Sequence, residues 1–119
     1  MKKEVKIKRI YEAYQRSDGF RILVDRLWPR GIKKETAHID AWMKEVAPST
    51  ALRNWFNHQP EHWEKFRERY LAELAKSEAA GELLQCVKSH PTVSLLYGAR
   101  DEEHNQAVVL RQYINDLLP

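Results

Sequence analysis

The sequence predicts an α/β fold: a single small layered domain whose short, mainly parallel sheet is flanked by helices. Two segments, residues 20–25 and 92–97, carry apolar side chains on both faces, as buried strands of a parallel sheet do. Between them the chain has the periodicity of several helices, and two parallel strands require a long crossover of this kind. Because the 119 residues contain no linker, repeat or low-complexity stretch, we expect residues 1–119 to form one domain.

Local signals define the remaining strand and the turns. Residues 5–10 begin with alternating lysine and apolar residues, which is the pattern of a half-exposed strand. Asp18-Gly19 predicts a turn before residue 20, because aspartate accepts local hydrogen bonds and glycine tolerates positive φ. Pro29 ends the strand region that follows, since proline has no N–H to donate to a sheet.

Capping and periodicity predict the helices. We expect a short helix at residues 40–46, a second beginning at 48–50, a third with Pro60 in its first turn, and a fourth over 78–89. The third helix has one apolar stripe at three- and four-residue intervals, formed by Trp63, Phe66, Tyr70 and Leu74. Together with Trp63, the residues Trp42 and Trp55 are interpreted as core residues of this helical layer.

The last helix is expected to follow a turn at residues 98–101. Asp101 is interpreted as its N-cap, because a negative carboxylate interacts favourably with the positive end of the helix dipole. His104 would then lie in the first turn. The inner side of this helix is predicted to carry Ala107, Leu110, Ile114 and Leu117.

Composition excludes several classes of protein. Hydrophobic residues make up 43% and charged residues 31% of the chain, which is ordinary for a globular protein. No apolar run reaches the roughly 20 residues of a membrane span, and the first residues lack the apolar stretch of a signal peptide. The single cysteine, Cys86, allows no internal disulfide and no cysteine-based metal cluster. We therefore expect a cytoplasmic protein without a membrane partner.

The charge is unevenly distributed. Residues 1–34 hold 11 Lys and Arg against 4 Asp and Glu, whereas residues 35–119 hold 9 against 13. Such an asymmetry is typical of a surface that meets nucleic acid or another polyanion. The alternative is a basic edge strand that its lysines keep unpaired and soluble, and the alternation of these lysines with apolar residues favours this second interpretation.

Two polar segments follow directly on the apolar strands and are the candidate site. They are residues 25–31 and 97–105, and each lies at the carboxyl end of a strand, where open α/β sheets bind ligands. If the two strands are parallel neighbours, both segments face one crevice. The expected pocket residues are Asp25, Arg26, Trp28, Arg30, Tyr97, Arg100, Asp101, His104 and Asn105.

Each of these residue types has a chemical reason to be in a site. Arginines hold an anionic group through their forked guanidinium, and Trp28 and Tyr97 would form an apolar wall. Asp25 and His104 are the candidate catalytic residues that would move a proton if a reaction takes place. The alternative for Asp25 is a structural ion pair with a nearby arginine, and for His104 it is local capping or packing.

Other chemistries have weaker support. Cys86 lies beside Leu83, Leu84 and Val87 and is interpreted as an inert buried thiol. The four glycines are scattered, whereas nucleotide and methyl-transfer cofactors require clustered glycines, so we expect no cofactor. Pro60 separates His58 from His62, so this pair loses a shared helix face as a metal chelate. A hard-ligand set of Asp25, Asp101 and His104 is the remaining metal alternative, and we do not assign a metal.

Three ordered motifs run through nearly the whole chain: residues 23–31, residues 47–50 followed by Leu52, Arg53, Trp55 and Phe56, and residues 97–110. They closely resemble the YeaO-like proteins of the domain-of-unknown-function 488 family. The resemblance implies a compact α/β fold in bacterial-type cytosolic proteins, and no biochemical activity transfers with it. A related branch of that family has cysteines around the turn at residues 97–105. This chain has none there, so thiol chemistry does not carry over.

The sequence thus leads to two hypotheses. The first is a small-molecule or anion-binding α/β domain, with hydrolase-like or transferase-like chemistry left open, whose pocket lies at the strand carboxyl ends. The alternative is weak nucleic-acid binding through the basic first third of the chain. In that case the guanidinium groups of Arg26 and Arg30 would contact phosphates, and the ring of Trp28 would stack on a base of the nucleic acid. Whether the protein is an enzyme, and its oligomeric state, stay open at this point.

Overall fold

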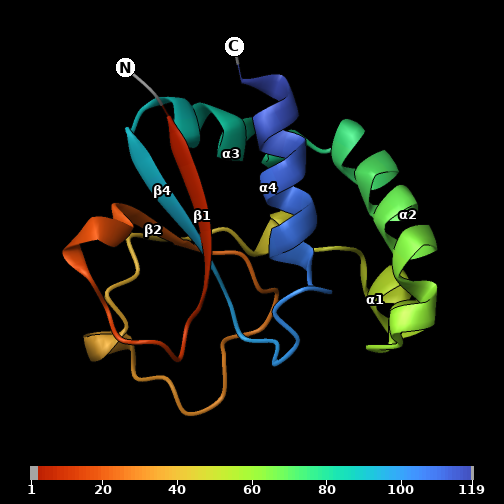
Figure 1. Ribbon diagram of the computed structural model, residues 1–119, viewed down its shortest axis with the longest axis horizontal. Coiled ribbons are helices and arrows are strands. Elements are labelled where there is room, and N and C mark those ends of the chain that lie inside the picture. The colour runs from red at the N-terminus through yellow and green to blue at the C-terminus, as the bar shows by residue number, and fades with distance from the viewer. Residues whose placement is uncertain (1–2, 119) are drawn as a thin grey trace.

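The centre of the molecule is a four-stranded parallel sheet in the order β1-β4-β2-β3, as a computed structural model that describes residues 3–118 shows (Figure 1). The strands are β1 (Glu4–Arg9), β2 (Phe20–Leu23), β3 (Ala41–Trp42) and β4 (Thr92–Tyr97). Every strand pair is parallel. The predicted α/β class and the two buried strands are confirmed, with the first of them ending at Leu23.

Four α-helices cover one face of this sheet within residues 3–118, and coil covers the other (Figure 1). The helices are α1 (Thr50–Phe56), α2 (Trp63–Ala75), α3 (Glu78–Lys88) and α4 (Gln106–Leu117). The core on the helical face includes Ile22, Val24, Val93, Leu95 and Tyr97 from the sheet region. The opposite face has a smaller core of Ile10, Leu23 and Leu96, which the partly buried Trp28, Ile32 and Ile39 cover.

The asymmetry of the layers follows from the connections. The chain passes from β1 to β2, and from β2 to β3, through segments that contain only short 3₁₀ turns. The helices α1 to α3 all lie in the crossover from β3 to β4, and α4 follows β4. Because a parallel crossover returns over one face, this helical passage packs on a single side of the sheet.

Gly19 shows why the turn before β2 needs glycine. Its φ is +71°, and a Cβ atom at this position would lie 2.2 Å from the carbonyl oxygen of Thr92. The predicted Asp18-Gly19 turn is therefore confirmed: Asp18 ends a 3₁₀ turn, and the glycine allows β2 to begin directly against β4.

The structure corrects the expectation of a helix at residues 40–46. Ala41–Trp42 instead form β3, and only Lys44–Val46 make a 3₁₀ turn. The N–H groups of Asp40 and Met43 donate to the carbonyls of Arg21 and Leu23, at 2.8 and 2.9 Å. This segment is therefore a strand because it forms hydrogen bonds with the edge of β2 that β4 does not occupy.

Two expectations about the helical layer were also wrong. Trp42 and Trp55 are 37% and 36% exposed, and Leu117 is 48% exposed, so these side chains lie outside the core. The last helix begins at Gln106 with Asn105 as its N-cap, and therefore Asp101 and His104 precede it. No helix among residues 3–118 has both the length and the apolar character that crossing a membrane requires.

Candidate functional site

The loops after β2 and β4 open onto one pocket of about 230 Å³. Asp25, Arg26 and Leu27 line it from the first loop, and Gly98, Ala99 and His104 line it from the second. The two loops lie side by side because β2 and β4 are neighbours, and the N–H of Val24 donates to the carbonyl of Leu96 at 3.0 Å. The structure thus brings the two strand-end segments together, as the sequence predicted.

Asp25 fastens the two loops to each other. Its Oδ2 accepts a hydrogen bond from the N–H of Gly98 at 2.9 Å, and its Oδ1 accepts one from Nε2 of Gln106 at 2.5 Å. A Cβ atom at residue 98 would lie 2.9 Å from Oδ2. Glycine at residue 98 therefore allows the backbone to approach the carboxylate this closely.

The environment of Asp25 changes its acidity. Burial raises its pKa to about 6, although the N–H of Gly98, the amide of Gln106 and the charge of Arg53 act in the opposite direction. Desolvation disfavours the charged form of a carboxyl group. Asp25 consequently changes its charge close to neutral pH, which is a property of groups that exchange protons in binding sites and active sites.

His104 enters the pocket wall as part of a histidine–carboxylate pair. Its Nδ1 lies 2.9 Å from Oδ2 of Asp101. Oδ1 of Asp101 accepts hydrogen bonds from the N–H groups of Glu103 and His104 at 2.9 and 3.0 Å. The bond from Glu103 is the main reason that the pKa of Asp101 is lowered. A carboxylate held in this way fixes the orientation of the ring.

The third wall of the pocket comes from the helical layer. Phe56, at the end of α1, and Phe66, in α2, are buried with their ring centroids 4.3 Å apart, and both line the pocket. Arg53 lines it from α1. Asn57 and His58 then adopt φ values of +44° and +54°, a left-handed turn that leaves His58 on the pocket wall. Two successive non-glycine residues with left-handed backbone conformations cost free energy, and such backbone strain is often found at functional sites.

Arg26 ties the loop after β2 to the segment before α1. Its Nη2 donates to the carbonyls of Ala47 and Pro48, at 3.2 and 3.4 Å. Its buried Nε has no hydrogen-bond partner among residues 3–118. Arg26 thus holds the two walls together while it contributes its positive charge to the pocket.

Four of the nine predicted site residues line this pocket, and five do not. Those that line it are Asp25, Arg26, His104 and Asn105. Trp28 turns to the coil-covered face, where Nε1 donates to the carbonyl of Ile32 at 2.7 Å. Tyr97 is buried in the core on the helical face. Arg30 and Arg100 are exposed outside the pocket, and Asp101 supports His104 from behind.

Several pocket residues were not predicted. They are Leu27, Ala47, Pro48, Arg53, Phe56, His58, Phe66, Gly98, Ala99 and Gln106. One signal was available, because Arg53 and Phe56 belong to the second of the three motifs. The prediction that ligands bind at the carboxyl ends of the strands does not consider that motif, because the motif lies on a helix whose position depends on tertiary packing.

The alternative role for Asp25, an ion pair with a nearby arginine, is not found within residues 3–118, where its hydrogen-bond partners are Gly98 and Gln106. In the same part of the chain, no group of three or more His, Cys, Asp and Glu side chains is placed to hold a metal ion. Cys86 is half-buried in α3, and burial raises the pKa of its thiol.

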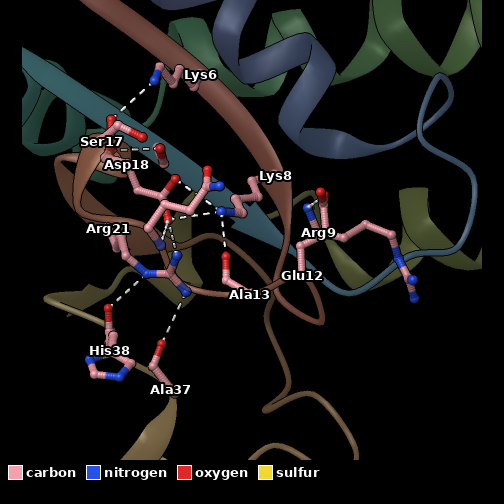
Figure 2. Close-up of polar contacts among 12 residues, drawn as sticks. Lys6, Lys8, Arg9, Glu12, Ala13, Ser17, Asp18, Arg21, Ala37 and His38 are labelled. Carbon is pink, nitrogen blue, oxygen red and sulfur yellow. Dashed lines mark hydrogen bonds and ion pairs between the residues drawn. The ribbon is translucent and has the colours of Figure 1, made fainter.

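Much of the positive charge in the first third binds the chain's own backbone (Figure 2). Lys6 donates to the carbonyl of Ser17, and Lys8 donates to that of Ala13 and to the carboxylate of Asp18. Arg21 is 2% exposed and donates to Asp18 and to the carbonyls of Ala37 and His38. β1, the strand with the lysines, lies at the edge of the sheet. These contacts have a structural purpose, and nucleic-acid binding stays an untested prediction.

Comparisons with known proteins agree with the resemblance in the three motifs. A family model described as the inactive DUF488-N3 subclade matches residues 4–119. The uncharacterized protein YeaO of Escherichia coli (strain K12) is 45% identical over 113 residues, which cover 95% of this chain and 98% of that protein. The uncharacterized protein Rv3073c of Mycobacterium tuberculosis (strain ATCC 25618 / H37Rv) is 40% identical over 111 residues, or 93% of each chain. No solved structure matches.

Proposed function

This chain belongs to the inactive DUF488-N3 subclade, and from that premise we propose that it binds a small ligand with an anionic group without turning it over. The proposed binding site is the pocket between the loops after β2 and β4 and the helix α1. The observation that carries the proposal is one cavity that combines two guanidinium groups, from Arg26 and Arg53, with an aromatic floor of Phe56 and Phe66.

The chemistry of the pocket walls supports an anionic ligand with an apolar body. Ligand sites are largely apolar, with a few polar groups that fix orientation. Arginine recognises carboxylate and phosphate groups through parallel N–H donors. Arg53 is exposed and its side chain has no hydrogen-bond partner within residues 3–118, so its donors are available. A cavity of about 230 Å³ suits a compact molecule.

The residue types on the walls favour binding over covalent catalysis. Among residues 3–118, no serine, threonine, cysteine, lysine or tyrosine lines the pocket, and these residues supply most protein nucleophiles. The word inactive in the description of the matching family model agrees with this reading. Asp25 and His104 would then orient the ligand by hydrogen bonding.

A screen of small anions tests the proposal. Benzoate, 4-methylpentanoate and phenyl phosphate are added to the protein, binding is detected as a rise in Tm, and Kd is measured by calorimetry. We expect at least one of them to bind, and Arg53→Gln to weaken it about tenfold or more, which is the effect of losing one charge-assisted hydrogen bond.

Arg100→Gln is the matched control, because Arg100 is also exposed but lies outside the pocket. Its Kd should stay within about twofold of the wild-type value. The proposal fails if none of the anions binds, or if both arginine variants weaken binding equally. NMR spectra of the bound compound after prolonged incubation should show it unchanged, and its conversion would disprove the absence of turnover.

A further inference from the structure

The pocket presents opposite charges on two of its walls. The carboxylate of Asp25 lies at the end of β2, and the guanidinium of Arg53 lies on α1. The charge of Arg53 lowers the pKa of Asp25 and so partly offsets the larger effect of burial. Nevertheless, no ion pair within 4.0 Å joins them in the part of the chain that the structure describes. The two charges therefore act on each other across the pocket without neutralising each other in direct contact.

Both charged groups keep hydrogen-bonding capacity for a ligand. Each carboxylate oxygen of Asp25 accepts one hydrogen bond, from Gly98 or from Gln106, whereas an ionised carboxylate has about four acceptor positions. The guanidinium of Arg53 has no acceptor within residues 3–118. One wall thus offers acceptors for a cationic group, and the other offers donors for an anionic group.

Apolar side chains line the same pocket. The buried rings of Phe56 and Phe66 stack on each other, and Pro48 and Leu27 complete the apolar lining. An apolar body of a few carbon atoms is stabilised there by about 25 cal/mol for each Å² of surface removed from water. The charges of Asp25 and Arg53 act on each other within one cavity of about 230 Å³, so the charged groups of a suitable ligand must be close together on one compact apolar body.

We propose that the ligand is a compact zwitterion of the apolar α-amino acid class, with its ammonium group on Asp25 and its carboxylate on Arg53. This inference rests on the proposed function and assigns a second, cationic group to the ligand. A simple anion would leave the charge of Asp25 unpaired beside it. A simple amine would leave the donors of Arg53 unused, so neither satisfies both walls.

A matched set of ligands tests the assignment. Calorimetry at pH 7.5 compares L-leucine with 3-methylbutylamine, which lacks the carboxylate, and with 4-methylpentanoate, which lacks the ammonium group. We expect L-leucine to bind about tenfold or more tightly than either analogue. A compound whose charged group loses its partner gives up about one charge-assisted hydrogen bond.

Two variants should remove the two halves of this preference separately. In Asp25→Asn, L-leucine and 4-methylpentanoate should bind with equal affinity, because the partner of the ammonium group has lost its charge. In Arg53→Gln, L-leucine and 3-methylbutylamine should bind equally. Arg16→Gln is the control, since Arg16 is exposed before β2, at the opposite end of that strand, and it should keep the wild-type order of affinities.

The possible outcomes separate this inference from the proposed function. If 4-methylpentanoate binds as tightly as L-leucine and Arg53→Gln weakens it, the zwitterion is wrong while the anion pocket stands. If the amine alone binds, or if none of the three compounds binds, the zwitterion is wrong, and the proposed function fails as well only if benzoate and phenyl phosphate also do not bind. Preference for L-leucine that survives in both variants would place the amino acid elsewhere and overturn the assignment.

Discussion

Asp25 is the residue with the largest consequence for the behaviour of this protein with pH. Its pKa is raised from 3.8 to about 6, so the folded state binds the proton more tightly than the unfolded state does. A group of this kind stabilises the fold fully below its unfolded pKa, and this contribution is lost as the pH rises through the folded pKa. Asp25 therefore favours the folded state most below about pH 3.8, and this contribution is lost as the pH rises to about 6 and above.

We predict that Asp25→Asn removes this dependence. From pH 4.5 to 8, the free energy of unfolding of the wild type should fall relative to the variant by about 2 kcal/mol, because each pKa unit corresponds to about 1.4 kcal/mol and the folded pKa of about 6 lies about 1.5 units above pH 4.5. Urea titrations at pH 4.5, 6 and 8 give the difference. The other charged and titratable side chains that line the pocket, Arg26, Arg53, His58 and His104, are the same in both proteins. A constant difference across this range would contradict the raised pKa.

Asp18 has the opposite character. It is 3% exposed and lies between Lys8 and Arg21 (Figure 2). Burial raises its pKa, but hydrogen bonds from Gln15, Lys8 and Arg21 outweigh this effect and lower the pKa below 3.8. Its contribution to stability is thus present above pH 3.8 and is lost as the pH falls through the folded pKa.

The variant Asp18→Asn should destabilise the protein by about 3–5 kcal/mol at pH 7, because it leaves the buried guanidinium of Arg21 without its counter-charge. Glu68→Gln is the matched control, since the Lys65–Glu68 pair is more than half exposed on both sides. Such surface pairs contribute about 0–1 kcal/mol. Denaturant midpoints of the two variants give the comparison, and similar small losses would mean that the Asp18 network is not stabilising.

At the level of elements, the start of α4 connects stability to the candidate site. Oδ1 of Asn105 accepts hydrogen bonds from the N–H groups of Ala107 and Val108, at 2.9 and 3.2 Å. Its Nδ2 donates to the carbonyl of Asp101 at 2.9 Å. The N-cap therefore fixes both the helix and the loop that positions His104.

We expect Asn105→Ala to cost about 2 kcal/mol of unfolding free energy, at the upper end of the range for a lost N-cap. Ser77→Ala, at the N-cap of α3, should cost about 1 kcal/mol, because within residues 3–118 the side chain of Ser77 accepts a single hydrogen bond, from the N–H of Ala80. Thermal or denaturant unfolding gives both values. The interpretation would be wrong if the serine variant proved the more destabilising of the two.

The elements that sequence patterns predict well are those with many buried residues. β4 is confirmed at residues 92–97, because a central strand is apolar on both faces. β3 has two residues, too few for a periodicity, and it exists because the edge of β2 is free. In the same way, the prediction that ligands bind at the carboxyl ends of the strands located the two loops of the pocket, whereas its third wall depends on how α1 and α2 pack. Local sequence does not encode that packing.

For the molecule as a whole, the two faces of the sheet differ in how firmly they are covered. The helical face has a large core to which all four α-helices between residues 3 and 118 contribute. The smaller core on the other face has three buried apolar residues between residues 3 and 118, Ile10, Leu23 and Leu96, under coil that contains Trp28. Few buried apolar contacts mean that a segment opens locally at a lower free energy than the global one.

We therefore predict that backbone amides at residues 27–39 exchange with deuterium well before those of β4 and α2. Trp28→Ala should accelerate this exchange further, because it removes the hydrogen bond from Trp28 to the carbonyl of Ile32 as well as the packing of the ring. It should also lower the global free energy of unfolding by about 2–3 kcal/mol. This is less than the loss for a fully buried tryptophan, because Trp28 is only half-buried. Peptide-resolved hydrogen exchange measures both effects. Since Trp28 lies on the opposite face from Phe56 and Phe66, ligand affinity in the pocket should stay within about twofold of the wild type. Exchange of all segments at one common rate would instead mean that both faces open as a single cooperative unit.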